Sequence, residues 1–138
     1  MSLKSASNLS DFSTMEFQQL TAHFAQWLIQ SGSELSPKFQ ISDLREEQQG
    51  RGLRATQAFA QDEVIFKIPR SVLLNVETGT LSQLSEENRE KLLTKYDHWE
   101  GLILTLLHEL SLGENSKWAP YFKMWPESFQ SLMYWSDT

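Results

Sequence analysis

The spacing of the apolar residues changes at Gly32, and this change decides which fold classes the chain can form. Before Gly32, apolar side chains recur every three or four residues and so share one helix face: Phe17, Leu20, Phe24, Trp27 and Leu28. Ser13 and Glu16 have the spacing of a capping box, and Gly32 can adopt the left-handed backbone that ends many helices. The pattern predicts a helix from about Thr14 to Ser31.

After Gly32, apolar and polar residues alternate in short runs, as they do in strands with one buried face. From about Glu34 to Val76 the alternating positions form three sets: Phe39 with Ile41; Val64 with Phe66 and Ile68; and Val72 with Leu74 and Val76. Turn-forming residues lie between the first two sets, at Gly50-Arg51-Gly52 and near Gln61-Asp62, and Pro69 follows the second set. We therefore expect small β-hairpins in this region.

The helical spacing returns after Ser85, which can cap a helix that carries Leu92, Leu93 and Tyr96. A further helix is predicted to begin after Asp97 and to end at Gly113. Apolar residues surround much of it, as in helices buried between two layers, and one face carries Trp99, Leu102, Ile103, Leu106 and Leu110.

Residues 118–126 hold four large aromatic side chains, which are more often packed in a core or between domains than arranged around a ligand. Ser116 is predicted to cap a short helix there, with Pro120 in its first turn. The chain ends soon after Tyr134 and Trp135, so we expect a domain that continues beyond Thr138.

The order of helix, hairpins and helices predicts an α+β fold. We divide the chain into a disordered tail at residues 1–12, a helix with hairpins at residues 13–77, and a helical region at residues 78–138. With 12 Lys and Arg against 18 Asp and Glu, the net charge is −6, which disfavours direct binding to nucleic acid. The longest apolar stretch, Leu102–Leu107, is too short to span a membrane, and residues 1–8 lack the apolar core of a signal peptide. A soluble intracellular protein is expected.

Few side chains are arranged for chemistry. The absence of cysteine excludes thiolate sites, and the three histidines do not have zinc-binding spacing, so no metal site is predicted. The acidic residues on the predicted helices are mixed with lysines, as on a solvated face. The pair Gly50 and Gly52 allows two interpretations: a backbone that approaches a ligand closely, or a tight turn between strands.

Taken in order, these segments resemble a known family. A tryptophan-bearing helix precedes residues 49–56, which read Gln-Gly-Arg-Gly-Leu-Arg-Ala-Thr, and Ile68-Pro69-Arg70-Ser71 follows. The order is similar to the first half of SET-domain (β-clip) protein-lysine methyltransferases of the Rubisco large-subunit methyltransferase type. Residues 99–103 and 117–125 resemble the fungal members that methylate a lysine of a large-subunit ribosomal protein. The resemblance runs from about Phe17 to Trp135.

This resemblance implies that the chain carries the first SET segment and the start of a helical insert. It implies a cofactor, S-adenosylmethionine, whose methionine end would be held by the turn of Gln49, Gly50, Arg51, Gly52 and Leu53. Backbone groups would make these contacts, with Arg51 or Arg54 adding charge. The implied substrate partner is a ribosomal large-subunit protein, and the implied location is the nucleus, with the cytoplasm as the alternative.

Family enzymes complete the site with an Asn-His pair and a tyrosine, and this chain matches neither. No asparagine precedes a histidine, and the tyrosines fall in or near the helical insert. We therefore expect no catalytic residue in the chain, no activity of the chain alone, and a missing carboxy-terminal half as a partner. Apolar surface should be exposed around Leu104, Leu107, Trp125 and Trp135. The rival hypothesis is a non-catalytic interaction module, or an inactive SET remnant, whose acidic surface binds a basic partner.

Overall fold

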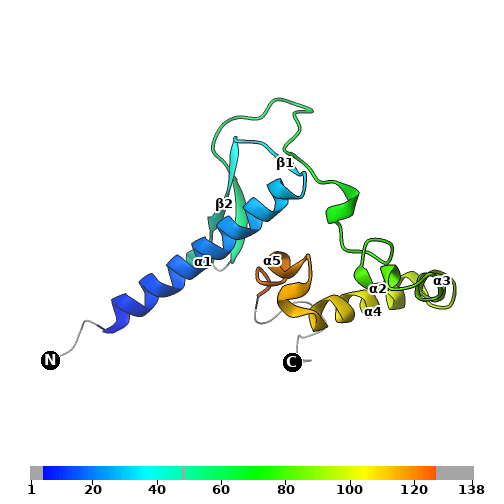
Figure 1. The fold of residues 1–138 in the computed structure, drawn as a ribbon. Coiled ribbons are helices and arrows are strands. Elements are labelled where there is room, and N and C mark those ends of the chain that lie inside the picture. Colours follow the sequence, from blue (N-terminus) through cyan, green and yellow to red (C-terminus); the bar gives the residue numbers. More distant parts are fainter. Residues whose placement is uncertain (1–4, 48, 127–138) are drawn as a thin grey trace, which may run out of the picture.

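A computed structural model describes residues 5–47 and 49–126 of the protein. The long helix α1 (Ser5–Gln30) lies alongside a hairpin of β2 (Phe39–Asp43) and β3 (Arg51–Ala55), as Figure 1 shows. The 3-10 turn η1 (Arg45–Glu47) connects the two strands, and a second, very short antiparallel pair joins β1 (Glu34–Leu35) to β4 (Phe66–Lys67). Helices beside small antiparallel sheets confirm the predicted α+β class.

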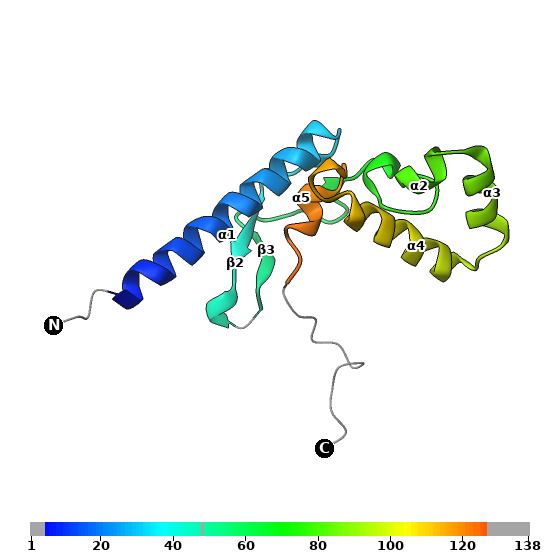
Figure 2. The same ribbon diagram turned by 60° about the horizontal axis from the view of Figure 1, so that its bottom comes forward.

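The second half of the chain is helical. The helices α2 (Thr80–Gln83), α3 (Glu86–Thr94) and α4 (His98–Ser111) pack on one another, and a turn, η2 (Arg70–Val72), precedes them. After η3 (Gly113–Asn115), the short helix α5 (Ala119–Phe122) returns the chain to α1 (Figure 2). Among the described helices, none combines the length and hydrophobicity that a membrane span requires.

Helix α1 begins nine residues before the predicted start at Thr14, because no glycine or proline interrupts residues 5–30. Ser13 therefore lies inside the helix, and the predicted capping box is wrong. The predicted end is confirmed: Gly32 has φ +87°, its N–H donates to the Ile29 carbonyl, and the Ser33 N–H donates to the Leu28 carbonyl. These two bonds form a Schellman motif.

The third alternating set of the sequence does not form a strand, so that prediction is wrong. Val72 ends η2, and the chain then turns because the Asn75 side-chain oxygen accepts the N–H groups of Glu77 and Thr78. Local side-chain bonds of this kind compete with strand pairing. The turn leads into α2, which the sequence pattern did not predict.

In the helical region, the predicted cap at Ser85 and the predicted helix start after Asp97 are confirmed. The Ser85 hydroxyl accepts the Asn88 N–H at 3.1 Å, and Asp97 forms a capping box with Glu100. Ser116 is not the cap of α5, whose N-cap is Trp118. The Ser116 hydroxyl instead accepts the Trp118 N–H and donates to Glu109.

Helix α4 buries a different face from the predicted one. Its buried residues are Gly101, Thr105 and Glu109, spaced four apart, whereas Trp99 on the predicted face is 71% exposed and Ile103 43% exposed. Leu107 is exposed, as predicted. The small residues allow close approach: a Cβ on Gly101 would lie 3.1 Å from a methyl carbon of Val76. The apolar side of α4 is therefore left largely uncovered by the described residues. Of the other predicted exposed positions, Leu104 and Trp125 are half-buried and Trp135 lies outside the described residues.

The core lies between η2 and the start of α5. Trp118 is 1% exposed, and its indole N–H donates to the Val72 carbonyl at 2.8 Å. Beside it, α1 and the α5 region share a cluster of rings in mutual contact: Phe24, Trp27, Tyr121, Phe122 and Trp125. The aromatic residues at 118–125 are thus packing residues, as the sequence indicated.

Candidate functional site

Of the five residues predicted to hold a cofactor, Gln49 and Gly50 end the loop between β2 and β3, and Arg51, Gly52 and Leu53 begin β3. The loop is closed by the Leu44 N–H, which donates to the Gly50 carbonyl at 2.7 Å, and by the Gln49 N–H, which donates to the Leu44 carbonyl. Gly50 has φ +68°, which an L-residue adopts at a cost of about 1 kcal/mol or more. A Cβ on Gly50 would meet no atom within 4 Å, so this glycine is needed for its backbone angle and faces open space.

Gly52 is needed for a different reason. A Cβ at this position would lie 2.4 Å from a methyl carbon of Leu44, which is a buried residue at the base of the loop. Gln49 and Leu53 are exposed on the two sides of the glycine pair. The five residues, called the turn of residues 49–53 below, therefore cover the last part of the loop and the start of β3, with space beside Gly50 and close packing at Gly52.

The Arg51 side chain points inward, toward α1 and the end of α5. Its guanidinium carbon lies 3.7 Å from the centre of the Phe17 ring, and its Nε donates to the Thr21 hydroxyl at 3.1 Å. A terminal nitrogen also donates to the Met124 carbonyl at 3.4 Å. Burial, followed by the nearby charge of Arg45, lowers the pKa of Arg51. Arg51 thus attaches the turn to the helices, and its charge is already engaged.

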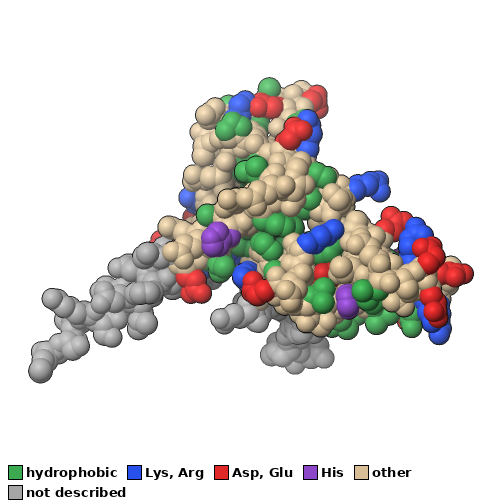
Figure 3. Space-filling model, viewed as in Figure 1, with side chains coloured by type: hydrophobic (Ala, Val, Ile, Leu, Met, Phe, Trp, Pro, Cys, Tyr) green, Lys and Arg blue, Asp and Glu red, His purple; other side chains and the backbone are tan. Residues whose placement is uncertain are grey.

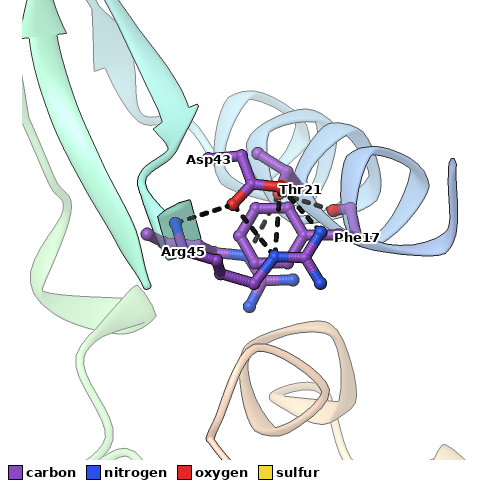
Figure 4. Close-up of polar contacts among 5 residues, drawn as sticks. Phe17, Thr21, Asp43 and Arg45 are labelled. Carbon is purple, nitrogen blue, oxygen red and sulfur yellow. Dashed lines mark hydrogen bonds and ion pairs between the residues drawn. The ribbon is translucent and has the colours of Figure 1, made fainter. Parts of the chain in front are cut away.

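A second arginine lies over the same ring. Arg45 is 4.1 Å from the centre of the Phe17 ring and forms a bidentate pair with Asp43, with its closest N–O distance at 2.7 Å. Figure 4 shows Asp43 and Arg45 meeting beside Phe17 and Thr21. The hydrogen bond from Arg45 is the main reason that the pKa of Asp43 is lowered. The cluster fixes the hairpin onto α1 next to the predicted turn.

Two open grooves flank this region. One, of about 600 Å³, lies between α1 and β2, and the other, of about 490 Å³, is lined mainly by apolar residues of α1, α4, the α5 region and residues 68–74. Figure 3 shows hydrophobic side chains gathered in the middle of one face of the molecule. None of residues 49–53 lines either groove, although Asp43 and Arg54 line the first. The turn is therefore next to a groove rather than inside one.

The sequence interpretation missed Glu109, the most buried carboxylate among the described residues. It is 0% exposed, and its Oε1 accepts the Thr80 N–H at 2.7 Å and the Thr80 hydroxyl, while its Oε2 accepts the Ser116 hydroxyl at 2.6 Å. Burial alone raises the pKa of Glu109, but the hydrogen bonds from Ser116 and Thr80 outweigh it, so its pKa is lowered. In the sequence, only its position four residues after Thr105 could have indicated that Glu109 lies on the same helix face as Thr105.

Known proteins resemble this chain over most of its length. Ribosomal lysine N-methyltransferase 4 of Saccharomyces cerevisiae is 42% identical over 126 residues, which cover 88% of this chain and 26% of the relative. N-lysine methyltransferase SETD6 of Rattus norvegicus is 37% identical over 118 residues, which cover 84% of this chain and 24% of the relative. The chain therefore spans about a quarter of the length of these curated relatives. No protein-family model matches the chain.

Proposed function

Since this chain is a homologue of SET-type protein-lysine N-methyltransferases, we propose that it forms one part of an S-adenosylmethionine-dependent enzyme of this kind. The observation that carries the proposal is the 42% identity to the yeast lysine methyltransferase across 88% of the chain. The proposed substrate is a lysine of a large-subunit ribosomal protein, because the yeast relative is named for ribosomal lysine. A net charge of −6 suits a basic ribosomal partner. The Rubisco-type subclass and a nuclear location stay predictions.

The turn of residues 49–53 fits one side of the proposed cofactor site. A Cβ on Gly50 would meet no atom within 4 Å, so a ligand has room to approach the backbone closely at this position. The Arg51 guanidinium is bound to Thr21 and Phe17, so backbone groups and not this side chain would hold the cofactor. When bound, S-adenosylmethionine supplies an electrophilic methyl group to a neutral lysine amine. In this proposal the described residues of the chain bind and orient the cofactor, and the group that removes the lysine proton comes from further polypeptide.

The central experiment uses a chimera in which this chain replaces the matching segment of the yeast relative. With labelled S-adenosylmethionine and large ribosomal subunits that lack the modification, we expect methyl transfer by the chimera and none by the 138-residue chain alone. Transfer by the chain alone would contradict the view that the site needs further polypeptide. A folded chimera without transfer would contradict the assignment of the activity, and would revive the rival hypothesis of a non-catalytic module.

Replacing Gly50 with alanine in this chimera tests the turn itself. We expect the KM for S-adenosylmethionine to rise about tenfold, because the new Cβ enters the open space where the cofactor would lie and strains the left-handed backbone. Gly113→Ala is the matched control: Gly113 also has a positive φ, +54°, and open space around its Cβ position. Both variants should lose about 1 kcal/mol of unfolding free energy, but only Gly50→Ala should change KM. Equal KM values would remove the turn from the site.

A further inference from the structure

The turn of residues 49–53 depends on support from outside its own hairpin. Two backbone bonds close the loop: the Leu44 N–H donates to the Gly50 carbonyl at 2.7 Å, and the Gln49 N–H donates to the Leu44 carbonyl at 3.0 Å. Strand β3 pairs with β2 in a two-stranded sheet, and a hairpin of two strands is marginally stable by itself. The position of the Gly50 backbone relative to the helices therefore depends on side chains that cross from the hairpin to α1 and α5.

Arg51 makes three contacts of this kind. Its Nε donates to the Thr21 hydroxyl at 3.1 Å, and its guanidinium carbon lies 3.7 Å from the centre of the Phe17 ring. One of its terminal nitrogens donates to the Met124 carbonyl at 3.4 Å. Phe17 and Thr21 lie together on α1 beside the hairpin (Figure 4), and Met124 follows α5. A single side chain thus joins β3 to two helical segments that are distant in the sequence.

The contacts require the chemistry of arginine. The Thr21 hydroxyl donates its own proton to the Phe17 carbonyl at 2.8 Å, so it accepts at its lone pairs and needs a donor from the hairpin. The planar guanidinium of Arg51 donates to Thr21 and to Met124 while it also lies against the Phe17 ring. A lysine ammonium is a compact charge on a flexible stem and does not reproduce this arrangement.

We propose that Arg51 is a positioning residue for the cofactor, which acts by fixing the Gly50 backbone relative to α1 and the end of α5. Gly50 directly precedes Arg51, so a shift of Arg51 reaches the Gly50 carbonyl through one peptide bond. The role toward the cofactor rests on the proposed function, whereas the attachment of the turn does not. The alternative is a direct bond from Arg51 to the cofactor carboxylate. That bond would give Thr21 no part in cofactor binding, so variants of Thr21 separate the two.

Binding of S-adenosylmethionine to variants of the chimera, measured by calorimetry, tests the proposal. Arg51→Gln should weaken binding by about tenfold. Thr21→Val removes the acceptor on α1 but keeps the side-chain shape, and it should weaken binding by about fivefold. The double variant should bind no more weakly than Arg51→Gln, because both changes break the same attachment. Thr94→Val is the matched control, since Thr94 also donates to the carbonyl four residues earlier but is exposed on α3.

Arg51→Lys separates the attachment from the charge. It keeps the positive charge but should bind S-adenosylmethionine almost as weakly as Arg51→Gln. Unweakened binding by Arg51→Lys or by Thr21→Val would overturn the proposal. In methyl-transfer assays, the KM for S-adenosylmethionine should rise about tenfold in Arg51→Gln, and the KM for the ribosomal substrate should stay within about twofold. A merely structural role would lower kcat through loss of folded enzyme and leave both KM values unchanged, which would also overturn the proposal.

Amide hydrogen exchange without cofactor distinguishes a failure of this inference from a failure of the proposed function. The Leu44 amide, which donates to Gly50, should exchange about tenfold faster in Arg51→Gln than in the unsubstituted chimera. Unchanged exchange in a folded variant would overturn the attachment. An unsubstituted chimera that binds no cofactor would refute the proposed function and the cofactor role of Arg51, and exchange at Leu44 would still decide whether Arg51 holds the turn. If Arg51→Gln does not fold, Thr21→Val and Arg51→Lys provide the same comparison.

Discussion

Replacing Trp118 with alanine is expected to lower the free energy of unfolding by about 3–5 kcal/mol, enough to unfold a marginally stable chain. The indole is 1% exposed and fills the space between η2 and α5. Its N–H donates to the Val72 carbonyl at 2.8 Å, so the substitution leaves both a cavity and an unpaired buried carbonyl. Urea unfolding followed by circular dichroism would measure the loss, because tryptophan fluorescence changes with the substitution itself.

Trp99→Ala is the control, since Trp99 is 71% exposed on α4 and should cost no more than about 0.5 kcal/mol. Trp118→Phe provides a second measurement if the alanine variant does not fold. Phenylalanine keeps most of the volume but cannot donate to Val72, so an intermediate loss is expected. Similar losses at Trp99 and Trp118 would contradict the burial of Trp118 and the position of the core.

Local signals predicted the parts of the fold that local interactions determine. Gly32, Ser85 and Asp97 each end or begin a helix through bonds to residues no more than five positions away, and all three were predicted correctly. The strand predicted at residues 72–76 does not form, because the Asn75 side-chain oxygen accepts the N–H groups of Glu77 and Thr78. An alternating sequence pattern does not reveal bonds of this kind. The prediction of the buried face of α4 was wrong because this helix packs closely against the turn before α2. Small side chains fit at that contact and leucine side chains do not.

In the candidate site too, the features set by local interactions could be predicted and those set by distant residues could not. Two glycines separated by one residue predicted a turn, and the structure has one. The orientation of Arg51 depends on Thr21, thirty positions earlier, and on Met124, seventy-three positions later, so no local pattern could predict it. Glu109 was missed because a glutamate on a helix usually lies in solvent, and only the fold brings Thr80 and Ser116 to its oxygens. Whether the turn holds a cofactor stays a prediction.

Replacing Glu109 with glutamine is expected to lower the free energy of unfolding by about 2–4 kcal/mol at neutral pH. Both oxygens accept from donors, Thr80 on one side and Ser116 on the other, so the amide NH₂ of glutamine must face either the Thr80 N–H, which is a donor, or the Ser116 hydroxyl, which would have to rotate and accept. In both cases the charge-assisted bonds to the carboxylate are lost. The carboxylate also occupies the start of α2, where Gly79 has no side chain to cap the helix. Glu77→Gln is the control, because Glu77 is exposed. It should lower the free energy of unfolding by no more than about 0.5 kcal/mol.

The advantage of glutamate over glutamine at position 109 should depend on pH in one direction. The hydrogen bonds make the pKa of Glu109 lower in the folded chain than its ordinary value of 4.5, so the folded state favours the charged form. The resulting stability is complete above about pH 4.5 and is lost as the pH falls through the folded pKa. Urea unfolding of both proteins between pH 7 and pH 3 should therefore show the difference narrowing below about pH 4.5. A difference that stays constant, or that grows in acid, would show that burial and not the bonds from Ser116 and Thr80 dominates at this carboxylate.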